Sequence, residues 1–393
     1  MTSLLPVDAA RAAVLAAVTP LGTEEVPLAQ ALGRVLARDV RAGGDVPPFR
    51  NSAMDGFAVA AGPADRRLRI VGESRAGSPA AVALGPGDAV RISTGAAVPD
   101  GADAVVMVER TEEHPDGTVT VHDEATPDRN VRGAGEDLRA GTVAVPAGTT
   151  LGPAALGVAA TAGVAHVTCA RRPRVALLAT GDELVPIGEP LPPGGIHDSN
   201  AVALAGYVAL AGGEVVSRTR TPDTAEATRA AIREALADAD VLISTGGVSV
   251  GAHDHVKDAL AAAGVEERFW RVALRPGKPT WFGVRGEQLV LGLPGNPVSA
   301  MVTFLLFARP ALLALQGAPA LAPRDTAVLT RAVPRHAVRD EMVRVTLDGD
   351  RATPTGPQGS HVMTSMLAAD ALALVPMGEG ELPAGAEVAV ERL

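Results

Sequence analysis

One stretch decides the fold of this chain: Asp240-Val-Leu-Ile-Ser-Thr-Gly-Gly-Val-Ser-Val-Gly-Ala-His-Asp254. It begins, at residues 241–244, with a short run of apolar or small side chains rich in β-branched types, which is typical of a strand buried on both faces. Gly246 and Gly247 follow closely, and glycine lets the backbone approach a ligand. The stretch therefore predicts a buried strand that opens into a binding loop.

Two other segments repeat this pattern. The strand expected at 174–179 runs into Thr180-Gly-Asp-Glu183, and the strand expected at 288–293 runs into Pro294-Gly-Asn-Pro297. In an open parallel α/β sheet, ligands bind outside the carboxyl ends of the strands. We therefore expect the three loops to line one crevice.

Composition narrows the classes of protein that this chain can belong to. With 393 residues it is long enough for two to four domains. Its formal net charge is -10 without any basic run, which argues against nucleic acid or an anionic membrane as the main partner. Cys169 is the single cysteine, so no intrachain disulfide can form, and this suits a reducing cytoplasm.

No membrane segment is expected. No run reaches the roughly 18 uncharged apolar residues that a membrane helix needs. Asp8 and Arg11 interrupt the apolar pattern near the N-terminus, so we expect neither a signal peptide nor a span there.

The first 172 residues predict two kinds of structure, helical segments and a small β domain. Apolar spacing favours helices at 6–18 and 28–38, which could pack on this chain or on a second subunit. Short apolar runs between Gly and Pro turns then predict a small β domain at 46–132, with strands at 68–71, 89–93, 104–108 and 118–121. A strand near 142–145 and a helix near 153–162 are expected to return to the opening helices, so that 1–45 and 133–172 form one helical linker or dimerisation domain.

From 173 to 320 strands and helices alternate, which predicts a doubly wound α/β domain. Thr221-Pro222 and Asn296-Pro297 are good starts for two of its helices. The expected helices are 199–211, 223–238, 253–263 and 297–309, and the expected strands are 174–179, 214–219, 241–244, 269–274, 280–284 and 288–293. Residues 321–393 predict a last β domain, a small barrel or sandwich, with strands near 326–333, 341–347, 371–375 and 387–391.

Four carboxylates stand at expected loop or helix-start positions: Asp55, Glu183, Asp223 and Asp254. Mg²⁺ takes oxygen ligands from one or two carboxylates together with substrate phosphate, so this supply suits a phosphate-bearing substrate. The loops lack both the Walker A lysine spacing and a GxGxxG fingerprint, which disfavours an ATPase and an NAD enzyme. Each acid alone could equally be a cap or a solvated loop residue.

Arg271, Arg275 and Lys278 lie within eight residues in an otherwise acidic chain. Pro276, Gly277 and Pro279 restrict the loop around the last two cations, which favours a rigid anion site over a solvated charge run. His253 and His255 flank Asp254, but no third ligand stands at a usual zinc spacing.

Seven motifs together resemble the MoeA family, the molybdopterin molybdenumtransferases, to which the C-terminal domain of gephyrin is similar. In order along the chain they are Asn51-Ser-Ala-Met-Asp-Gly56, Thr94-Gly-Ala-Ala-Val-Pro99, Gly135-Glu-Asp137, Thr180-Gly-Asp-Glu-Leu184, Ser244-Thr-Gly-Gly-Val-Ser-Val-Gly251, Arg275-Pro-Gly-Lys-Pro279 and Gly292-Leu-Pro-Gly-Asn-Pro-Val-Ser299. The resemblance spans essentially the whole chain. It implies an enzyme that inserts molybdenum from molybdate into adenylylated molybdopterin, with Mg²⁺-dependent release of AMP, in the last step of molybdenum cofactor biosynthesis.

The resemblance also implies a homodimer with an active site between the α/β domain of one subunit and the Asp55 domain of the other, and it allows transient contact with the adenylyltransferase and with proteins that mature molybdoenzymes. The implied catalytic residues are Asp55, Thr94, Asp137, Glu183, Asp223 and Asp254, of which Glu183, Asp223 and Asp254 would hold the metal. The implied substrate-binding residues are Gly246, Gly247, Ser249, Arg271, Arg275, Lys278, Pro294, Gly295, Asn296, Ser299, Arg344 and Ser360.

Two alternatives remain from the sequence. An adenylyltransferase uses the same type of α/β domain, but it would not need residues 1–172. A scaffold protein such as gephyrin would not need Asp55 and the cation loop together.

Overall fold

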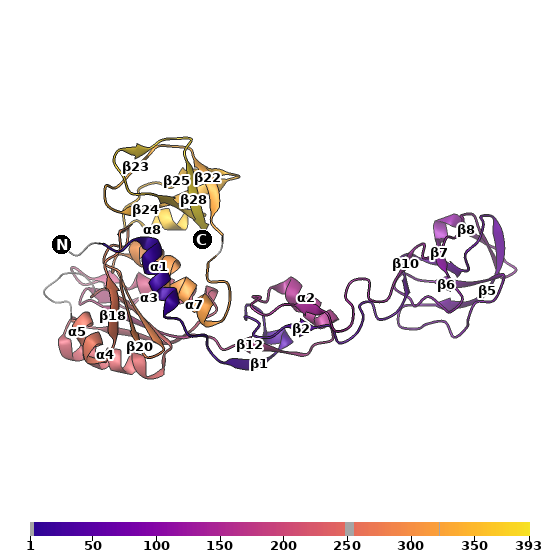
Figure 1. Ribbon diagram of the computed structural model, residues 1–393, viewed down its shortest axis with the longest axis horizontal. Helices are drawn as coiled ribbons and strands as arrows, with labels where there is room; N and C mark the ends of the chain where they lie inside the picture. The colour runs from indigo at the N-terminus through magenta and orange to yellow at the C-terminus, as the bar shows by residue number, and fades with distance from the viewer. Residues whose placement is uncertain (1–3, 248–254, 322) are drawn as a thin grey trace. The chain divides into compact units, whose positions relative to one another are not determined.

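The computed structural model describes residues 4–247, 255–321 and 323–393. The chain divides into two compact units, which are described separately (Figure 1). Unit 1 comprises Met1–Glu24, Gly33–Ala37 and Cys169–Leu393, and unit 2 comprises Glu25–Leu32 and Arg38–Thr168. The α/β segment and the C-terminal β segment thus belong to the same unit.

The central sheet of unit 1 has the strand order β16-β13-β17-β21-β20-β18. The four strands from β16 to β21 run parallel, whereas β20 and β18 are antiparallel additions. In chain order the strands are β13 (Arg174–Thr180), β16 (Glu214–Thr221), β17 (Val241–Thr245), β18 (Glu266–Trp270), β20 (Trp281–Arg285) and β21 (Gln288–Leu293). The strand predicted from the opening stretch, β17, is therefore central and fully buried.

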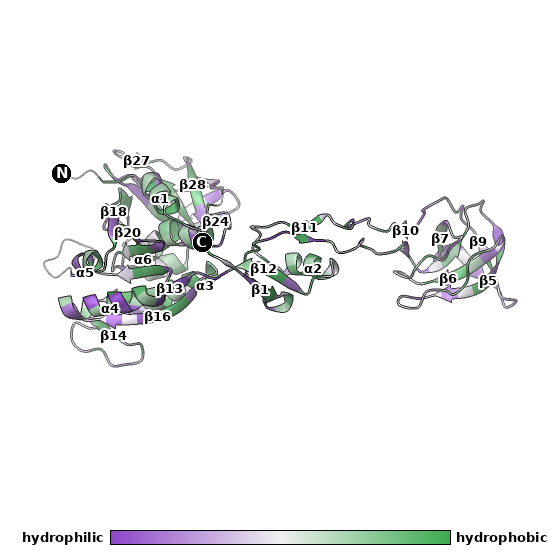
Figure 2. Cartoon of the chain, turned by 60° about the horizontal axis from the view of Figure 1, so that its bottom comes forward, coloured by the Kyte–Doolittle hydropathy of each residue, from purple (hydrophilic) through white to green (hydrophobic). Residues whose placement is uncertain are grey.

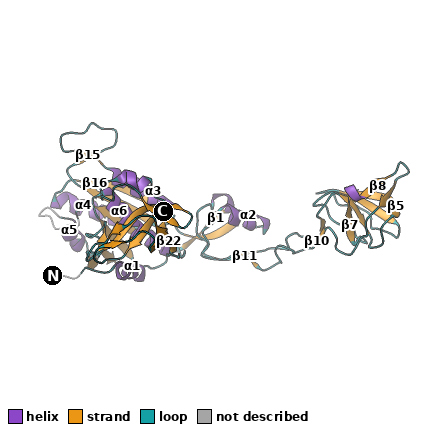
Figure 3. Cartoon of the chain, turned by 90° about the horizontal axis from the view of Figure 1, so that it is seen from above, coloured by secondary structure: helices purple, strands orange, loops and turns teal. Residues whose placement is uncertain are grey.

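Helices cover both faces of this sheet, as the doubly wound prediction requires (Figure 3). Successive side chains of β13 alternate between two cores: Val175 and Leu177 join the first, and Ala176 and Leu178 join the second. The first core also takes α1 (Val7–Ala16), α3 (Ser199–Leu210) and the 297–315 helix, and the second takes α4 (Ala225–Asp238) and α5 (Val256–Ala262). Hydrophobic side chains gather on the strands, while α4 carries hydrophilic residues as well (Figure 2). Because α1 is buried in the first core, it packs on its own chain.

One long helix runs through the first core in three parts: α6 (Pro297–Thr303), a π-helical turn (Phe304–Ala308) and α7 (Arg309–Leu315). In a regular α-helix the carbonyl of Leu306 would accept from the N–H of residue 310, but Pro310 has none. The buried Arg11 of α1 supplies the missing donor, since its Nε lies 3.1 Å from the Leu306 oxygen. This bond therefore joins α1 to the irregular point of the core helix.

By length and composition, the helix over Pro297–Leu315 could cross a membrane, with a mean hydropathy of 1.9. However, 83% of its apolar window is buried inside the fold. Its apolar surface is therefore already covered by the sheet and by neighbouring helices, as expected for a core helix.

The C-terminal segment closes into a barrel of five strands, because β24 pairs with both β25 and β26. The barrel strands are β22 (Asp325–Leu329), β24 (Asp340–Asp348), β25 (Arg351–Pro354), β26 (Ala371–Val375) and β28 (Glu387–Arg392). Short elements accompany it: β19 (Leu274–Arg275), β23 (Val333–Pro334), α8 (Met363–Leu367) and β27 (Glu381–Leu382). Of the two predicted architectures, barrel or sandwich, the structure has the barrel.

Unit 2 contains the predicted small β domain, a sheet in the order β7-β4-β6-β5-β9-β8. Its strands are β4 (Gly56–Val59), β5 (Arg66–Ser74), β6 (Asp88–Ile92), β7 (Ala104–Met107), β8 (Thr111–Glu113) and β9 (Thr118–Val121), with a 3₁₀ turn at Val108–Arg110. The other elements near unit 2 are β1 (Thr23–Pro27), β2 (Val40–Arg41), β3 (Asn51–Ser52), β10 (Val131–Arg132), β11 (Val143–Val145), α2 (Pro153–Thr161) and β12 (His166–Ala170). β2 pairs with β11, which brings residues 143–145 beside residues 40–41, whereas the opening helix α1 belongs to unit 1.

The helix predicted at 28–38 is wrong. This segment holds only a 3₁₀ turn at Leu28–Gln30, and Gly33 then has a φ of 72°, which ends helical geometry. Val35 accepts a bond from the amide of Ala170, and Leu36 forms a bridge with Cys169. The apolar residues of this segment are compatible with either a helix or an extended chain. Pairing with residues 169–170 holds the segment extended.

Two helix boundaries also differ from the prediction. The helix expected at 223–238 begins at Ala225, because the Thr224 side chain, rather than Thr221, accepts the bond from the Ala227 amide. The helix expected to end at 309 continues through Pro310 to Leu315, because proline is tolerated where its missing donor falls at a π-helical turn.

Replacing Arg11 with Met should lower the free energy of unfolding by about 2–4 kcal/mol, since it leaves the Leu306 carbonyl without its donor and removes one of the two arginines that pair with Glu391. In a Pro310→Ala background the loss should shrink by at least about 1 kcal/mol, because residue 310 would then offer an N–H to Leu306. Urea unfolding of the double-mutant cycle measures this coupling. Arg229→Met, on the exposed face of α4, is the control; purely additive losses would contradict the proposed bond.

Candidate functional site

The three glycine-bearing loops meet at one edge of the central sheet, as predicted. Register pairing places Ala179 beside Thr245 and Thr245 beside Leu293, so β13, β17 and β21 end level with one another. The loops that follow must therefore leave the sheet side by side.

The glycines are required by close backbone approach. Gly246 has a φ of 83°, and a Cβ there would lie 2.8 Å from the Thr180 carbonyl oxygen. A Cβ on Gly247 would lie 2.2 Å from the Val256 side chain, and one on Gly295 would lie 3.7 Å from Gly246. The second and third loops thus touch through glycine.

These loops line a cavity of about 620 Å³. Of the predicted site residues, Glu183, Gly246, Pro294, Gly295 and Asn296 line it. The Thr180 hydroxyl, beside the same loops, is buried and has no hydrogen-bond partner among the described residues. An unpaired buried hydroxyl is costly, so the site is suited to a polar ligand.

Sequence reasoning missed part of the lining. His197, Asp198, Ser199 and Asn200, around the start of α3, border the cavity, as does His361 from the C-terminal segment. Asp198 caps α3 by accepting from the Ala201 amide, and Asn200 donates to the Gly295 carbonyl at 2.8 Å. The sequence did contain one indication of these residues: Asp198-Ser-Asn200 is a run of helix-capping residue types at the start of the helix predicted at 199–211.

The cation loop reaches the same cavity through Pro279. Gly277 has a φ of 126°, and a Cβ there would lie 2.6 Å from Thr303 in the core helix, so the loop packs tightly against α6. Lys278 and Arg275 are both exposed. Packing against α6 therefore fixes the loop that presents Arg275 and Lys278 to solvent.

A buried carboxylate stands beside this loop. Glu341 accepts from Arg275 at 3.5 Å. Burial raises the pKa of the Glu341 carboxyl above its ordinary value, while Arg275, Arg339 and Arg344 oppose the rise. Arg275 is thus partly neutralised, whereas Lys278 has no ion-pair partner among the described residues and offers its charge fully.

Arg344 is fully buried and organises the loop before His361. Its guanidinium donates to Ser365 Oγ at 2.7 Å and to the carbonyls of Pro357 and Gly359, each at 3.2 Å. Its Nη1 is buried and unpaired among the described residues. The implied role of Arg344 in holding molybdate stays a prediction, but the structure shows that it shapes the loop carrying Ser360.

Ser360 joins this loop to the last glycine loop. Its hydroxyl accepts from Asn296 Nδ2 at 3.0 Å, and its carbonyl accepts from the Val298 amide. Ser299 lies in the first turn of α6 and is buried. Arg271, by contrast, lies with its guanidinium 3.9 Å from the centre of the Trp270 ring, so in this structure it is engaged by stacking.

The carboxylates of unit 1 stand on adjacent loops. Thr180 and Thr221 are register partners at the ends of β13 and β16, and Glu183 and Asp223 follow them. The Asp223 amide donates to Asp182 at 3.1 Å, which ties the two loops together. Glu183 is exposed and lines the cavity, whereas Asp223 is not part of its lining.

Two predicted residues, Ser249 and Asp254, lie outside the described residues. Within residues 4–247, 255–321 and 323–393, no group of three or more His, Cys, Asp or Glu side chains is placed to hold a metal ion. The predicted set of Glu183, Asp223 and Asp254 therefore stays a prediction.

In unit 2 the structure brings Asp55 and Thr94 together. Asp55 Oδ1 accepts from the Thr94 amide at 2.6 Å and from its hydroxyl at 3.1 Å. Gly56 has to be glycine, because a Cβ there would lie 2.0 Å from the Val106 carbonyl oxygen. Asp137 is exposed, and its amide donates to the Val46 carbonyl.

The sequence is similar to three family descriptions in succession. Residues 5–163 match "MoeA N-terminal region (domain I and II)", residues 176–314 match "Probable molybdopterin binding domain", and residues 326–393 match "MoeA C-terminal region (domain IV)". A molybdopterin molybdenumtransferase of Haemophilus influenzae is 36% identical, over 99% of this chain and 98% of its own length. Molybdopterin molybdenumtransferase 2 of Mycobacterium tuberculosis is 39% identical, over 93% of this chain and 94% of its own.

Solved structures give the same picture. A molybdopterin biosynthesis MoeA protein from Pyrococcus horikoshii OT3 superposes with a TM-score of 0.86 at 28% identity, covering 100% of both chains. Another structure of a Pyrococcus MoeA protein gives 0.82 at 33% identity, covering 99% of this chain and 98% of its own.

Gly246→Ala should lower the free energy of unfolding by about 1–3 kcal/mol, because the new Cβ meets a backbone oxygen at a positive φ. Gly295→Ala should change it by no more than about 0.5 kcal/mol, since its Cβ would make an ordinary contact. Urea unfolding compares the two variants directly. Equal losses would show that the close approach of the loops is not what requires Gly246.

Proposed function

We propose, from the premise that this chain belongs to the MoeA family and is a transferase of molybdenum cofactor biosynthesis, that it inserts molybdenum from molybdate into adenylylated molybdopterin. Water hydrolyses the phosphoanhydride of that substrate, so that AMP leaves and the molybdopterin keeps its own phosphate. The proposal is supported above all by the cavity at the strand ends, where the glycine loops and the cation loop converge.

The cavity suits both halves of such a substrate. Backbone groups at Gly246 and Gly295 approach closely enough to cradle a pterin and phosphates. The positive end of the helix that begins at Pro297 would favour an anion bound beside Asn296. Lys278, with Arg275 beside it, would hold the tetrahedral oxyanion molybdate. Ser299, Ser360 and Arg344 would complete that subsite.

Mg²⁺ fits the oxygen donors on the loops after β13 and β16. Glu183 and Asp223 would hold it together with Asp254, and substrate phosphate would supply further oxygen ligands. When bound, the ion offsets the charge that develops on the leaving phosphate. The protein's own part is to fix the phosphoanhydride against the glycine loops while Lys278 holds the second substrate nearby.

We further propose that the enzyme is a cytoplasmic homodimer, in which Asp55, Thr94 and Asp137 of one subunit complete the site of the other. The short bonds between Asp55 and Thr94 preorganise that carboxylate for such a role. Transient contact with the adenylyltransferase that supplies the substrate would follow from this scheme.

The decisive experiment follows AMP formation by purified protein given adenylylated molybdopterin. AMP should appear rapidly only when molybdate and Mg²⁺ are both present, because cleavage of the adenylylated substrate waits until the molybdenum donor is bound. Withholding either one is the control. Net synthesis of the adenylylated compound from ATP would favour an adenylyltransferase instead, and no AMP under any condition would favour a scaffold.

Lys278→Glu should raise the molybdate concentration needed for half-maximal AMP release at least about tenfold, because it removes a charge-assisted hydrogen bond and repels the anion. The unfolding midpoint should stay within the range of surface substitutions, since Lys278 is exposed. Arg285→Glu, at an exposed position on β20, is the matched control. An unchanged molybdate dependence would remove the cation loop from the site.

Mixing Asp55→Ala with Glu183→Ala chains tests the shared site. Each variant alone should be inactive, whereas exchanged subunits should recover part of the AMP release, because some heterodimers contain one intact site. Exchange is verified by differently sized affinity tags. Absence of recovery after verified exchange would count against a site that two subunits share.

A further inference from the structure

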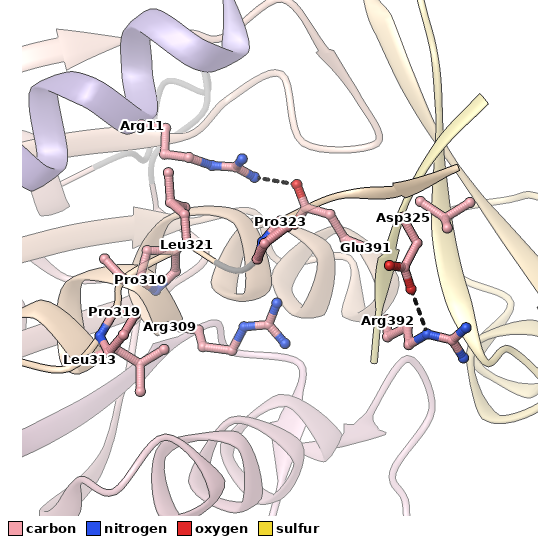
Figure 4. Close-up of a pocket in the computed structure, with 12 residues that line it drawn as sticks. Arg11, Arg309, Pro310, Leu313, Pro319, Leu321, Pro323, Asp325, Glu391 and Arg392 are labelled. Carbon is pink, nitrogen blue, oxygen red and sulfur yellow. Dashed lines mark hydrogen bonds and ion pairs between the residues drawn. The ribbon is translucent and has the colours of Figure 1, made fainter. Parts of the chain in front are cut away.

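A second cavity of unit 1, of about 600 Å³, shares no lining residue with the glycine-loop cavity (Figure 4). It lies where α1, α7 and β28 come together, and most of its wall is apolar, with Pro310, Leu313, Pro319 and Val390 among its residues. Cavities of this size and composition are typical of small-molecule sites when a few polar groups converge on them.

Positive charge exceeds negative charge at this cavity. Glu391 accepts from Arg11 at 2.8 Å and from Arg324 at 3.2 Å, and it also acts electrostatically on Arg309. Arg324, which does not line the cavity, also pairs with Asp8 at 3.1 Å. Among the lining residues, three arginines (Arg11, Arg309 and Arg392) therefore face two carboxylates (Asp325 and Glu391). Arg392 and Asp325 form the other ion pair of the wall, with 2.8 Å between Nε and Oδ2, so their charges already balance each other.

Arg309 is the guanidinium left over. It is partly buried in the cavity wall, and among the described residues no hydrogen bond or ion pair of its side chain is found; Figure 4 accordingly draws dashed lines from Arg11 and Arg392 but none from Arg309. Burial lowers the pKa of Arg309; Glu391 opposes this shift, and neighbouring Arg11 adds to it. A guanidinium that only shares a distant carboxylate in an apolar wall is costly unless an anion joins it directly.

We infer that this cavity binds a small monoanionic ligand with an apolar body, whose carboxylate pairs with Arg309 while its hydrocarbon part lies against Leu313 and Val390. Guanidinium and carboxylate have matching planar geometry, which favours a two-pronged contact. The apolar wall excludes a strongly hydrated ion such as free phosphate as the preferred occupant.

Octanoate is a suitable probe, with octanamide as its neutral counterpart of nearly the same shape. Calorimetric titration of the full chain should show saturable binding of octanoate and binding of octanamide that is at least about tenfold weaker, because only the anion pairs with Arg309. Arg309→Gln should weaken octanoate binding by a similar factor and leave octanamide unaffected. Arg331→Gln, the same change at an exposed position, is the matched control.

Leu313→Glu provides a second variant. Residue 313 lies one helical turn from Arg309, so the new carboxylate should pair with it and occupy the place of the ligand. Octanoate binding should then be lost while the unfolding midpoint is kept, whereas Leu313→Gln should retain weakened binding. This variant keeps the inference testable if Arg309→Gln folds poorly.

Three results would overturn the inference. They are the absence of saturable octanoate binding to the parent chain, equal affinities for octanoate and octanamide, and an affinity for octanoate that Arg309→Gln and Leu313→Glu leave unchanged. A loss of octanoate binding in Lys278→Glu would also overturn it, because the anion would then occupy the cation loop.

Discussion

The level ending of three parallel strands is the constraint on which the rest of this structure depends. Because Ala179, Thr245 and Leu293 are neighbours in register, the loops that follow must converge, and at Gly246 the backbones come too close for any side chain. The start of α3, the cation loop and the His361 segment complete the cavity around these glycine loops. The binding site is thus a consequence of strand register.

Arginine performs structural work that is unusual for a charged side chain. Arg11 donates to the Leu306 carbonyl, which Pro310 leaves without a donor. Arg344 donates to two carbonyls of a loop that has no helix or strand of its own. In both cases a planar fork of donors reaches several acceptors at once, which a lysine could not do. Burial of these cations is costly, and the bonds offset that cost only as complete sets.

The two cavities of unit 1 differ in the chemistry that they can accept. The cavity at the strand ends has a backbone cradle, exposed cations and a carboxylate, which suits a polar substrate with several charges. The cavity beside α7 has an apolar wall and one uncompensated guanidinium, which suits a ligand with a single charge. The first lining is polar and suits a well-hydrated ligand, whereas the second is mostly apolar and suits a poorly hydrated one. One ligand would therefore not suit both cavities.

The sequence by itself determined the doubly wound domain, because its strands are uninterrupted apolar runs that end in glycine and its helices have clear periodicity. It also indicated which loops carry chemistry, since glycines follow the strand runs; the structure then showed that a Cβ at Gly246 or Gly277 would clash with its neighbours. It could not determine whether 28–38 is a helix, because that outcome depends on pairing with Cys169 and Ala170, far away in the chain. Likewise, only the tertiary structure decided that Asp198 and His361 line the cavity and that Arg309 has no direct ion pair among the described residues, because burial and partners arise when distant segments pack together, and no local pattern records them.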